Sequence, residues 1–174
     1  MSQQGVPFRV IPDPFRFAAE SRSVEGKLAA ANLLRLSDAL ASAESVLEWQ
    51  FEGSMVEGAQ GLEPRLRLRV EGELELCCQR CLGGLKWPLR VDTLLQPVRS
   101  GQEIPEEELE NDEVDAIEIE GGLDVLALLE VESLLALPIA PRRQVCEAPR
   151  PEGGTSKESP FAALASLRGS PSAE

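Results

Sequence analysis

Apolar side chains recur at every second position over much of residues 46–91, and this alternation limits the chain to folds built around a β-sheet. Residues 46–52 place leucine, tryptophan and phenylalanine between polar residues, and residues 65–70 alternate arginine with leucine and valine. Period-two alternation is typical of strands with one buried and one solvated face. The sequence therefore predicts an antiparallel sheet over about residues 46–98.

Segments outside these strands predict a loop, a turn, one more strand and two helices. Glycines at 53–61 indicate a loop, and the glycine pair at 83–84 indicates a turn. The Leu/Ala-rich stretch 24–42 has high helix propensity, and residues 123–137 have apolar side chains at helical spacing. A short strand is expected at 114–119. The predicted class is α+β, with the sheet packed against two helices.

The two ends of the chain have different compositions from the middle. Residues 5–16 contain three prolines and predict an extended segment rather than a helix. We expect a single domain over 1–146 and a disordered, Pro/Gly/Ser-rich linker over 147–159. Residues 160–168 predict a short helical motif that docks on its own domain or on another protein. Its candidate docking side chains are Phe161, Leu164 and Leu167.

The chain contains no histidine and no tyrosine. Histidine is the usual general base near neutral pH and the commonest metal ligand, so Ser–His, Cys–His and zinc–histidine chemistry are excluded. We expect a protein that is not an enzyme. No apolar run approaches the roughly 20 residues that span a bilayer, and the N-terminus does not resemble a secretory signal. The predicted location is the cytoplasm, without a membrane partner.

Cys78 and Cys81 form a Cys-x-x-Cys motif, with Cys77 directly before it and Cys146 far along the chain. A two-residue spacing lets both sulfurs of a turn reach one metal ion, and zinc takes four ligands. Three interpretations stay open: reduced structural thiols, zinc held by Cys78, Cys81 and Cys146, or a redox pair. Cys77 fits a metal site poorly, because neighbouring strand residues point to opposite faces. No cofactor other than zinc is suggested.

Arg65, Arg67 and Arg69 share one face of their predicted strand, about 6.6 Å apart at the ordinary strand rise. This spacing is close to that of phosphates along a nucleic acid, and arginine makes bidentate phosphate contacts. With nearby cations they make a candidate RNA-contact set: Arg65, Arg67, Arg69, Arg80, Lys86 and Arg90. The alternative is cross-strand pairing with the acidic residues Glu48, Glu52, Glu73 and Glu75.

The negative charge of the chain is concentrated between Gly101 and Leu134, where 13 acidic and no basic residues occur. The whole chain has 30 acidic and 17 basic residues, so the remainder is neutral. Such a run is either a solvated surface or a docking surface for a basic partner. The candidate docking residues are Glu106, Glu107, Glu108, Glu110 and Asp112.

Four segments follow one another in a recognisable order: the Cys78–Cys81 motif with the strand up to residue 100, then 118–132, 135–146 and 160–167. In this order they resemble the YceD family, the large ribosomal RNA subunit accumulation proteins of bacteria and plastids. The resemblance spans roughly residues 8–168. Family members often carry a histidine before the last cysteine, where this chain has Arg142 and Arg143.

The resemblance implies a role in the synthesis, processing or stability of 23S ribosomal RNA. It also implies a genetic association with a small basic protein of the large ribosomal subunit. One hypothesis is an assembly factor that contacts pre-ribosomal RNA, and the alternative is an acidic escort for a basic large-subunit ribosomal protein. Neither requires a catalytic residue or a small-molecule substrate. The sequence predicts no particular oligomeric state.

Overall fold

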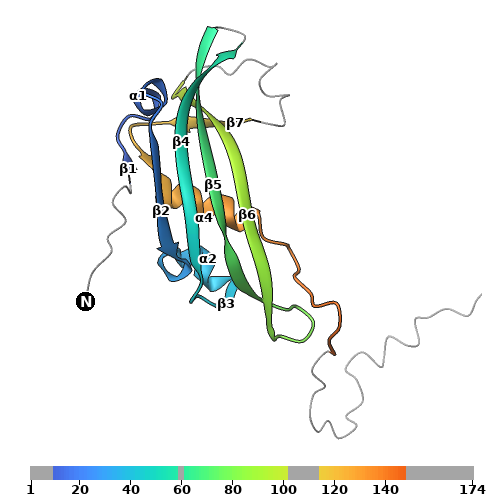
Figure 1. The fold of residues 1–174 in the computed structure, drawn as a ribbon. Helices are drawn as coiled ribbons and strands as arrows, with labels where there is room; N and C mark the ends of the chain where they lie inside the picture. Colours follow the sequence, from blue (N-terminus) through green and yellow to red (C-terminus); the bar gives the residue numbers. More distant parts are fainter. Residues whose placement is uncertain (1–9, 59–60, 102–113, 148–174) are drawn as a thin grey trace, which may run out of the picture.

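The largest element of the computed structural model, which describes residues 10–58, 61–101 and 114–147, is a mixed sheet of six strands (Figure 1). Five strands lie in the order β2-β4-β5-β6-β7, and β3 pairs with the C-terminal end of β5. These findings confirm the α+β class. The strands are β2 (Ser23–Ala29), β3 (Leu40–Ser42), β4 (Val46–Gly58), β5 (Gly61–Cys77), β6 (Gly84–Arg99) and β7 (Asp115–Ile119).

Helices and a second, two-stranded sheet complete the described part of the chain. The helices are α1 (Pro14–Ala19), α2 (Leu34–Asp38) and α4 (Val125–Leu135), and β1 (Val10–Ile11) pairs with β8 (Leu123–Asp124). α1 packs on β4 and β5, and α4 packs on β5 and β6. Within the described residues, no helix has both the length and the apolar character needed to span a membrane.

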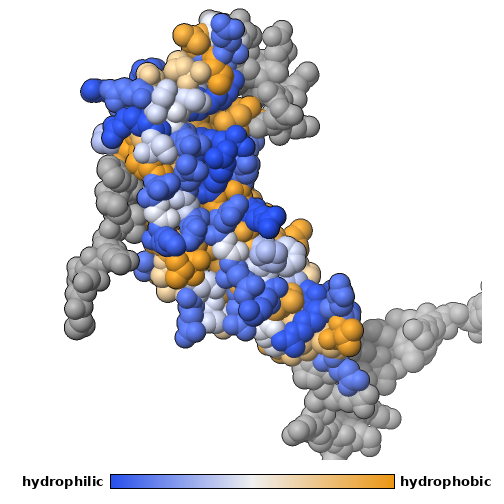
Figure 2. All heavy atoms as spheres, in the orientation of Figure 1, coloured by the Kyte–Doolittle hydropathy of each residue, from blue (hydrophilic) through white to orange (hydrophobic). Residues whose placement is uncertain are grey.

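The helices cover one face of the sheet. Side chains of the strands therefore alternate between a buried face under the helices and a face exposed to solvent. On β4, Leu47, Trp49 and Phe51 are buried, whereas Glu48 on the opposite face is exposed. The rings of Phe51 and Phe17 of α1 lie 5.7 Å apart between centroids, so the helix is joined to the sheet by aromatic packing. The outer face of the sheet is mostly hydrophilic (Figure 2).

The antiparallel pairing predicted over about residues 46–98 is confirmed. Strands β4 and β5 also pair through residues for which a loop was predicted. β4 and β5 pair from Glu48↔Glu71 to Gly58↔Gly61, so the predicted loop over 53–61 is wrong for residues 53–58. Gly53 lies inside β4 because α1 approaches the strand there. A Cβ atom on Gly53 would lie 2.7 Å from Cα of Ala18, which is too close for any other residue.

The predicted helix over 24–42 is wrong. Residues 23–29 form strand β2, which pairs antiparallel with β4. After it come a 3₁₀ turn (Ala30–Asn32), the short helix α2 and strand β3. Helix propensity is a weak preference, and here pairing with a neighbouring strand outweighs it. Gly26, opposite Trp49 and close to its ring, was a signal against the helix.

The predicted extended segment over 5–16 is correct only for strand β1 among the residues described. Helix α1 begins at Pro14, because the first helical position needs no backbone N–H and suits proline. Asp13 caps this helix by accepting a hydrogen bond from the amide of Arg16 at 3.0 Å. A proline preceded by aspartate was therefore a helix start.

Helix α4 lies within the region 123–137 where a helix was predicted, after the two residues of β8. Asp124 is its N-cap and accepts the amides of Leu126 and Ala127 at 3.0 Å each. Glu130 then accepts the amide of Arg35 at 2.7 Å, at the start of α2, which has no side-chain cap of its own. α4 thereby stabilises the segment between β2 and β3.

Strand β7 confirms the strand predicted at 114–119 but pairs parallel to β6, from Leu95↔Asp115 to Arg99↔Ile119. The sheet is therefore mixed rather than purely antiparallel. The linker and helical motif predicted over 147–168 lie outside the described residues from position 148 onward. They stay predictions, as does the single domain over 1–146.

Candidate metal centre

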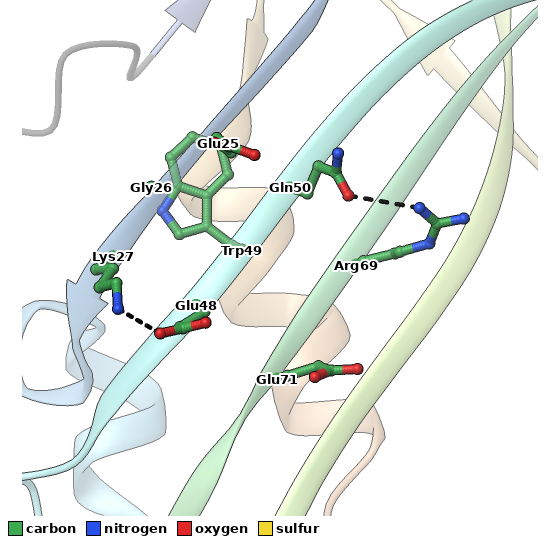
Figure 3. A pocket seen from close by; sticks show the side chains of 8 residues that line it. All are labelled: Glu25, Gly26, Lys27, Glu48, Trp49, Gln50, Arg69 and Glu71. Carbon is green, nitrogen blue, oxygen red and sulfur yellow. Dashed lines mark hydrogen bonds and ion pairs between the residues drawn. The ribbon is translucent and has the colours of Figure 1, made fainter.

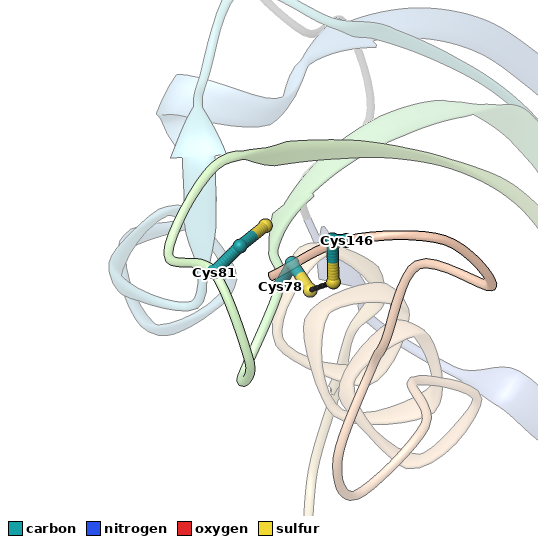
Figure 4. A group of neighbouring side chains, drawn as sticks. All are labelled: Cys78, Cys81 and Cys146. Atoms are coloured by element: carbon teal, nitrogen blue, oxygen red, sulfur yellow. Dashed lines mark hydrogen bonds between the residues drawn. The ribbon is translucent and has the colours of Figure 1, made fainter. Parts of the chain in front are cut away.

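The loop between β5 and β6 is a tight turn that carries two of the cysteines. The amide of Cys78 donates to the carbonyl of Gly83 at 2.9 Å, and the amide of Leu82 donates to the carbonyl of Cys78 at 2.8 Å. Leu82 adopts a left-handed backbone conformation with φ of +60°. The turn places Cys78 and Cys81 on one short loop at the end of the hairpin (Figure 4).

Cys146 reaches this loop from the segment that follows α4 (Figure 4). The amide of Gln79 donates to the carbonyl of Pro141 at 2.8 Å, which holds the segment against the loop. The Arg143 amide donates to Sγ of Cys78 at 3.3 Å, and its guanidinium donates to the carbonyl of Gly84. Cys146 thus lies beside Cys78, although the two are 68 positions apart in sequence.

The three clustered sulfurs have the spacing of metal ligands. Sγ of Cys78 lies 3.8 Å from Sγ of Cys146, and all three ligand sulfurs lie within 4.8 Å of one another. Two thiolates bound to one tetrahedral zinc at about 2.3 Å would be about 3.8 Å apart. Cys78 is buried, and Cys81 and Cys146 are half-buried. The predicted set of Cys78, Cys81 and Cys146 therefore fits a metal ion such as zinc.

Backbone amides favour the thiolate form of Cys78. Hydrogen bonds from the amides of Arg143, Cys81 and Arg80 lower the pKa of Cys78 from 9.0 to about 6. Burial raises the pKa of Cys146, and the adjacent Cys78 sulfur adds to this. A bound cation would favour the thiolate of Cys146 as well. We therefore expect metal binding at neutral pH to release a proton from Cys146.

Cys77 lies outside the cluster, in agreement with the sequence prediction. Its Sγ donates to the carbonyl of Leu82 at 3.5 Å. Within the described ranges, no fourth ligand joins the three thiols. A zinc ion held by these three thiols would take its fourth ligand from outside the cluster.

The arginines of β5 lie on the outer face of the sheet, where carboxylates engage them. Arg67 makes two hydrogen bonds to Asp92, with Nε–Oδ1 at 2.6 Å and Nη2–Oδ2 at 2.7 Å. Nη1 of Arg69 lies 3.3 Å from Oε2 of Glu52, and its Nε lies 3.7 Å from Oδ1 of Asp92. The structure therefore contains cross-strand pairing of the kind the sequence left open.

Arg65 is the least accessible of these arginines. Its Nη2 donates to Oε2 of Glu63 at 2.9 Å, and both side chains are only 11% exposed. Removing one member of a buried pair leaves the other charge uncompensated, which costs about 3–5 kcal/mol. Arg65 is therefore poorly placed for contact with an RNA phosphate, because its side chain is nearly buried and already paired.

The pair between Arg67 and Asp92 gives a testable effect of pH on stability. Arg67 lowers the pKa of Asp92 below its ordinary 3.8, chiefly by hydrogen bonding. The pair therefore stabilises the fold above pH 3.8, and this contribution is lost as the pH falls through the lower folded-state pKa. We expect a small but measurable coupling free energy at pH 7, because both side chains are half-exposed and water screens their interaction.

A double-mutant cycle with Arg67→Gln and Asp92→Asn checks this coupling. Urea unfolding would be measured for the four proteins at pH 7 and near pH 2. A coupling that is as large in acid as at pH 7 would show that the two side chains do not interact as an ion pair.

The part of the chain that a known family shares begins within β5 and includes the cysteine loop, β6, β7 and α4. The model of the family described as "Large ribosomal RNA subunit accumulation protein YceD" matches residues 66–168. This chain belongs to the YceD family. A search of curated proteins and a search of solved structures each gave no significant match. The match to the YceD family includes all three clustered cysteines.

The remaining candidate residues of this YceD-family chain differ in their surroundings. Lys86 pairs with Glu73 at 2.6 Å, whereas Arg80 and Arg90 are exposed and make none of the ion pairs recorded between described residues. Two sets lie outside the described residues. They are the acidic candidates Glu106, Glu107, Glu108, Glu110 and Asp112 and the docking candidates Phe161, Leu164 and Leu167.

One contributor to the site was not found from the sequence. Arg143 acts through its backbone amide on Cys78 and through its guanidinium on Gly84. The only sequence signal was its position three residues before Cys146. A backbone donor leaves no side-chain pattern, so the fold was needed to assign it.

A separate hollow of about 430 Å³ opens between side chains of β2, β4 and β5 (Figure 3). Lys27 pairs with Glu48, and Arg69 donates to Gln50 at 3.4 Å. The indole N–H of Trp49 has no hydrogen-bond partner among the described residues. Three carboxylates face two cations there, so the hollow is unfavourable for a phosphate. Its lining residues are Glu25, Gly26, Lys27, Glu48, Trp49, Gln50, Arg69 and Glu71.

Proposed function

We propose that this protein promotes the accumulation of 23S ribosomal RNA as a non-enzymatic assembly factor of the large ribosomal subunit, in the cytoplasm. The observation that carries this proposal is the family match over residues 66–168, more than half of the chain. Accumulation of the large ribosomal RNA is the role named for that family. We propose that it raises the amount of this RNA by acting on its synthesis, its processing or its stability.

Binding rather than catalysis is the mode that the chemistry of the chain supports. Without histidine, the reactive groups in the described residues are thiols, carboxylates and amines. The strongest grouping is the cysteine cluster, which joins the β5–β6 loop to the segment after α4. A metal there would supply a structural crosslink between the two segments, in which Cys78, Cys81 and Cys146 are the protein ligands.

Direct contact with pre-ribosomal RNA is the proposed route to this effect. Contact would use cations that no carboxylate neutralises, because breaking an ion pair reduces the gain from a phosphate contact. Arg80 and Arg90 meet this condition within the candidate RNA-contact set, judged by the ion pairs of the described residues. Arg67, Arg69 and Lys86 meet it less well.

Purification of the tagged full chain from its native cells, with and without nuclease, tests this function. We expect 23S precursor RNA in the purified material, with the protein partners lost after nuclease treatment. Depletion of the protein should also lower 23S relative to 16S ribosomal RNA. Recovery of one basic ribosomal protein regardless of nuclease would instead support the acidic escort, and an unchanged RNA ratio would reject both roles.

A further inference from the structure

The cysteine cluster is bordered by arginines that make no ion pair within the part of the chain that the structure describes. Arg80 lies between Cys78 and Cys81 in the loop, and Arg142 and Arg143 lie in the segment that carries Cys146. All three are exposed, and none takes part in the ion pairs recorded for the described residues. On the strands, by contrast, Lys27, Arg67, Arg69 and Lys86 each have a carboxylate partner.

Backbone hydrogen bonds bring these three arginines together from distant parts of the sequence. The amide of Gln79 donates to the carbonyl of Pro141, and Arg80 and Arg142 each follow one member of that bonded pair. The guanidinium of Arg143 reaches across to Gly84 with one of its N–H groups, so other donors on the same group stay available. The three arginines therefore lie on two backbone segments that meet at the end of the β5–β6 hairpin.

Among the described residues, hydrogen bonds from backbone amides attach the segment that carries Arg142 and Arg143 to the cysteine loop. The segment after α4 is not a strand of either sheet, and the Gln79 and Arg143 amides attach it to the loop. Sγ of Cys146 lies beside Sγ of Cys78, so a metal shared by both would fix Arg142 and Arg143 next to Arg80. Without that metal, hydrogen bonds such as those of the Gln79 and Arg143 amides would hold the arginines together, and less firmly.

We infer that Arg80, Arg142 and Arg143 form one surface that binds the phosphate backbone of ribosomal RNA, and that the cysteine cluster assembles it. This inference deepens the proposed function and rests on it. Guanidinium groups suit phosphate oxygens because they donate in pairs at fixed geometry. The outer face of the sheet offers less, since Lys27, Arg67, Arg69 and Lys86 are paired there, leaving Arg90 without a recorded ion pair, and the hollow beside Trp49 is rich in carboxylates.

The test measures binding of the zinc-loaded full chain to a 23S ribosomal RNA transcript over a range of salt concentrations. The variant Arg80→Gln, Arg142→Gln, Arg143→Gln removes three proposed phosphate contacts. We expect at least about tenfold weaker binding and a slope of log K against log salt that is smaller by about 2. The matched control Arg16→Gln, Arg22→Gln, Lys27→Gln loses the same charge from paired cations outside the candidate RNA-contact set and should change binding less than about threefold.

Two further variants separate the effect of charge from the effect of folding. The triple Arg→Lys protein should keep most of the binding and the salt slope, and Cys146→Ser should weaken binding although all three arginines are present. Equal losses in the glutamine variant and the paired-cation control would overturn the inference, because only net charge would then matter. Binding to an acidic protein that depends on the three arginines, without RNA binding, would also overturn it.

Failure of this inference and failure of the proposed function give different results. If the wild-type chain binds the transcript and the three arginines are dispensable, the surface is wrong and the function stands. If the wild-type chain binds no ribosomal RNA even at low salt, direct RNA contact fails and the inference fails with it.

Discussion

Replacing Cys78 with serine is expected to abolish stoichiometric zinc binding and the stability that zinc provides. Cys78 is buried, carries the thiolate favoured by three backbone amides, and lies next to both other ligands. A ligand that binds only the folded chain stabilises it by about 4 kcal/mol when it is present at a thousand times its dissociation constant. Metal analysis of anaerobically purified protein and thermal unfolding with and without zinc would measure both effects.

Cys77→Ser is the matched control for this variant. Its sulfur is directed to the carbonyl of Leu82 rather than into the cluster, so zinc content should be unchanged. If the wild-type protein, purified without oxygen or chelator, contains no metal and takes up no added zinc, the metal centre is wrong. The cluster would then consist of reduced structural thiols or of a redox pair.

Gly53→Ala is expected to lower the free energy of unfolding by about 2–3 kcal/mol, near the upper end of the usual cost of overpacking. The added Cβ would lie 2.7 Å from Cα of Ala18 and 2.8 Å from Cδ1 of Phe17. Because Ala18 presents its backbone, the contact cannot be relieved by a rotamer change. Helix α1 would have to move away from β4, which would weaken the packing of Phe17 on Phe51.

Urea unfolding of Gly53→Ala beside Ser54→Ala measures this effect. Ser54 is the next residue of β4 and is exposed, so its truncation should change stability by less than about 0.5 kcal/mol. Equal stabilities for Gly53→Ala and the wild type would mean that α1 does not rest on β4 as the structure has it.

The sheet could be predicted from the sequence where one face is buried and the other is exposed to solvent over many consecutive residues. Leu66, Leu68 and Val70 alternate with arginines, and this pattern specified both the strand and its buried side. The same reasoning failed for residues 24–42, because leucine and alanine are compatible with a helix and with a strand. The neighbouring strand β4 decided between them.

Only part of the candidate metal site could be predicted from the sequence, for a related reason. Cys78 and Cys81 are near in sequence, so their spacing alone indicated a shared ligand. Cys146 could be named as a third ligand only by residue type. Its contact with Cys78 depends on backbone bonds from Gln79 and Arg143 that no side-chain pattern records.

The sequence by itself determined the α+β class, the central antiparallel strands, helix α4 and the family. These rest on local periodicity and on motifs whose residues are close along the chain. The tertiary structure alone decided that β2 is a strand, that β7 runs parallel to β6, that Arg67 and Arg69 are neutralised, and that Arg142 and Arg143 lie beside Arg80. Each of these depends on which distant segments become neighbours, and the free energy of such contacts exceeds the small conformational preferences of single residues.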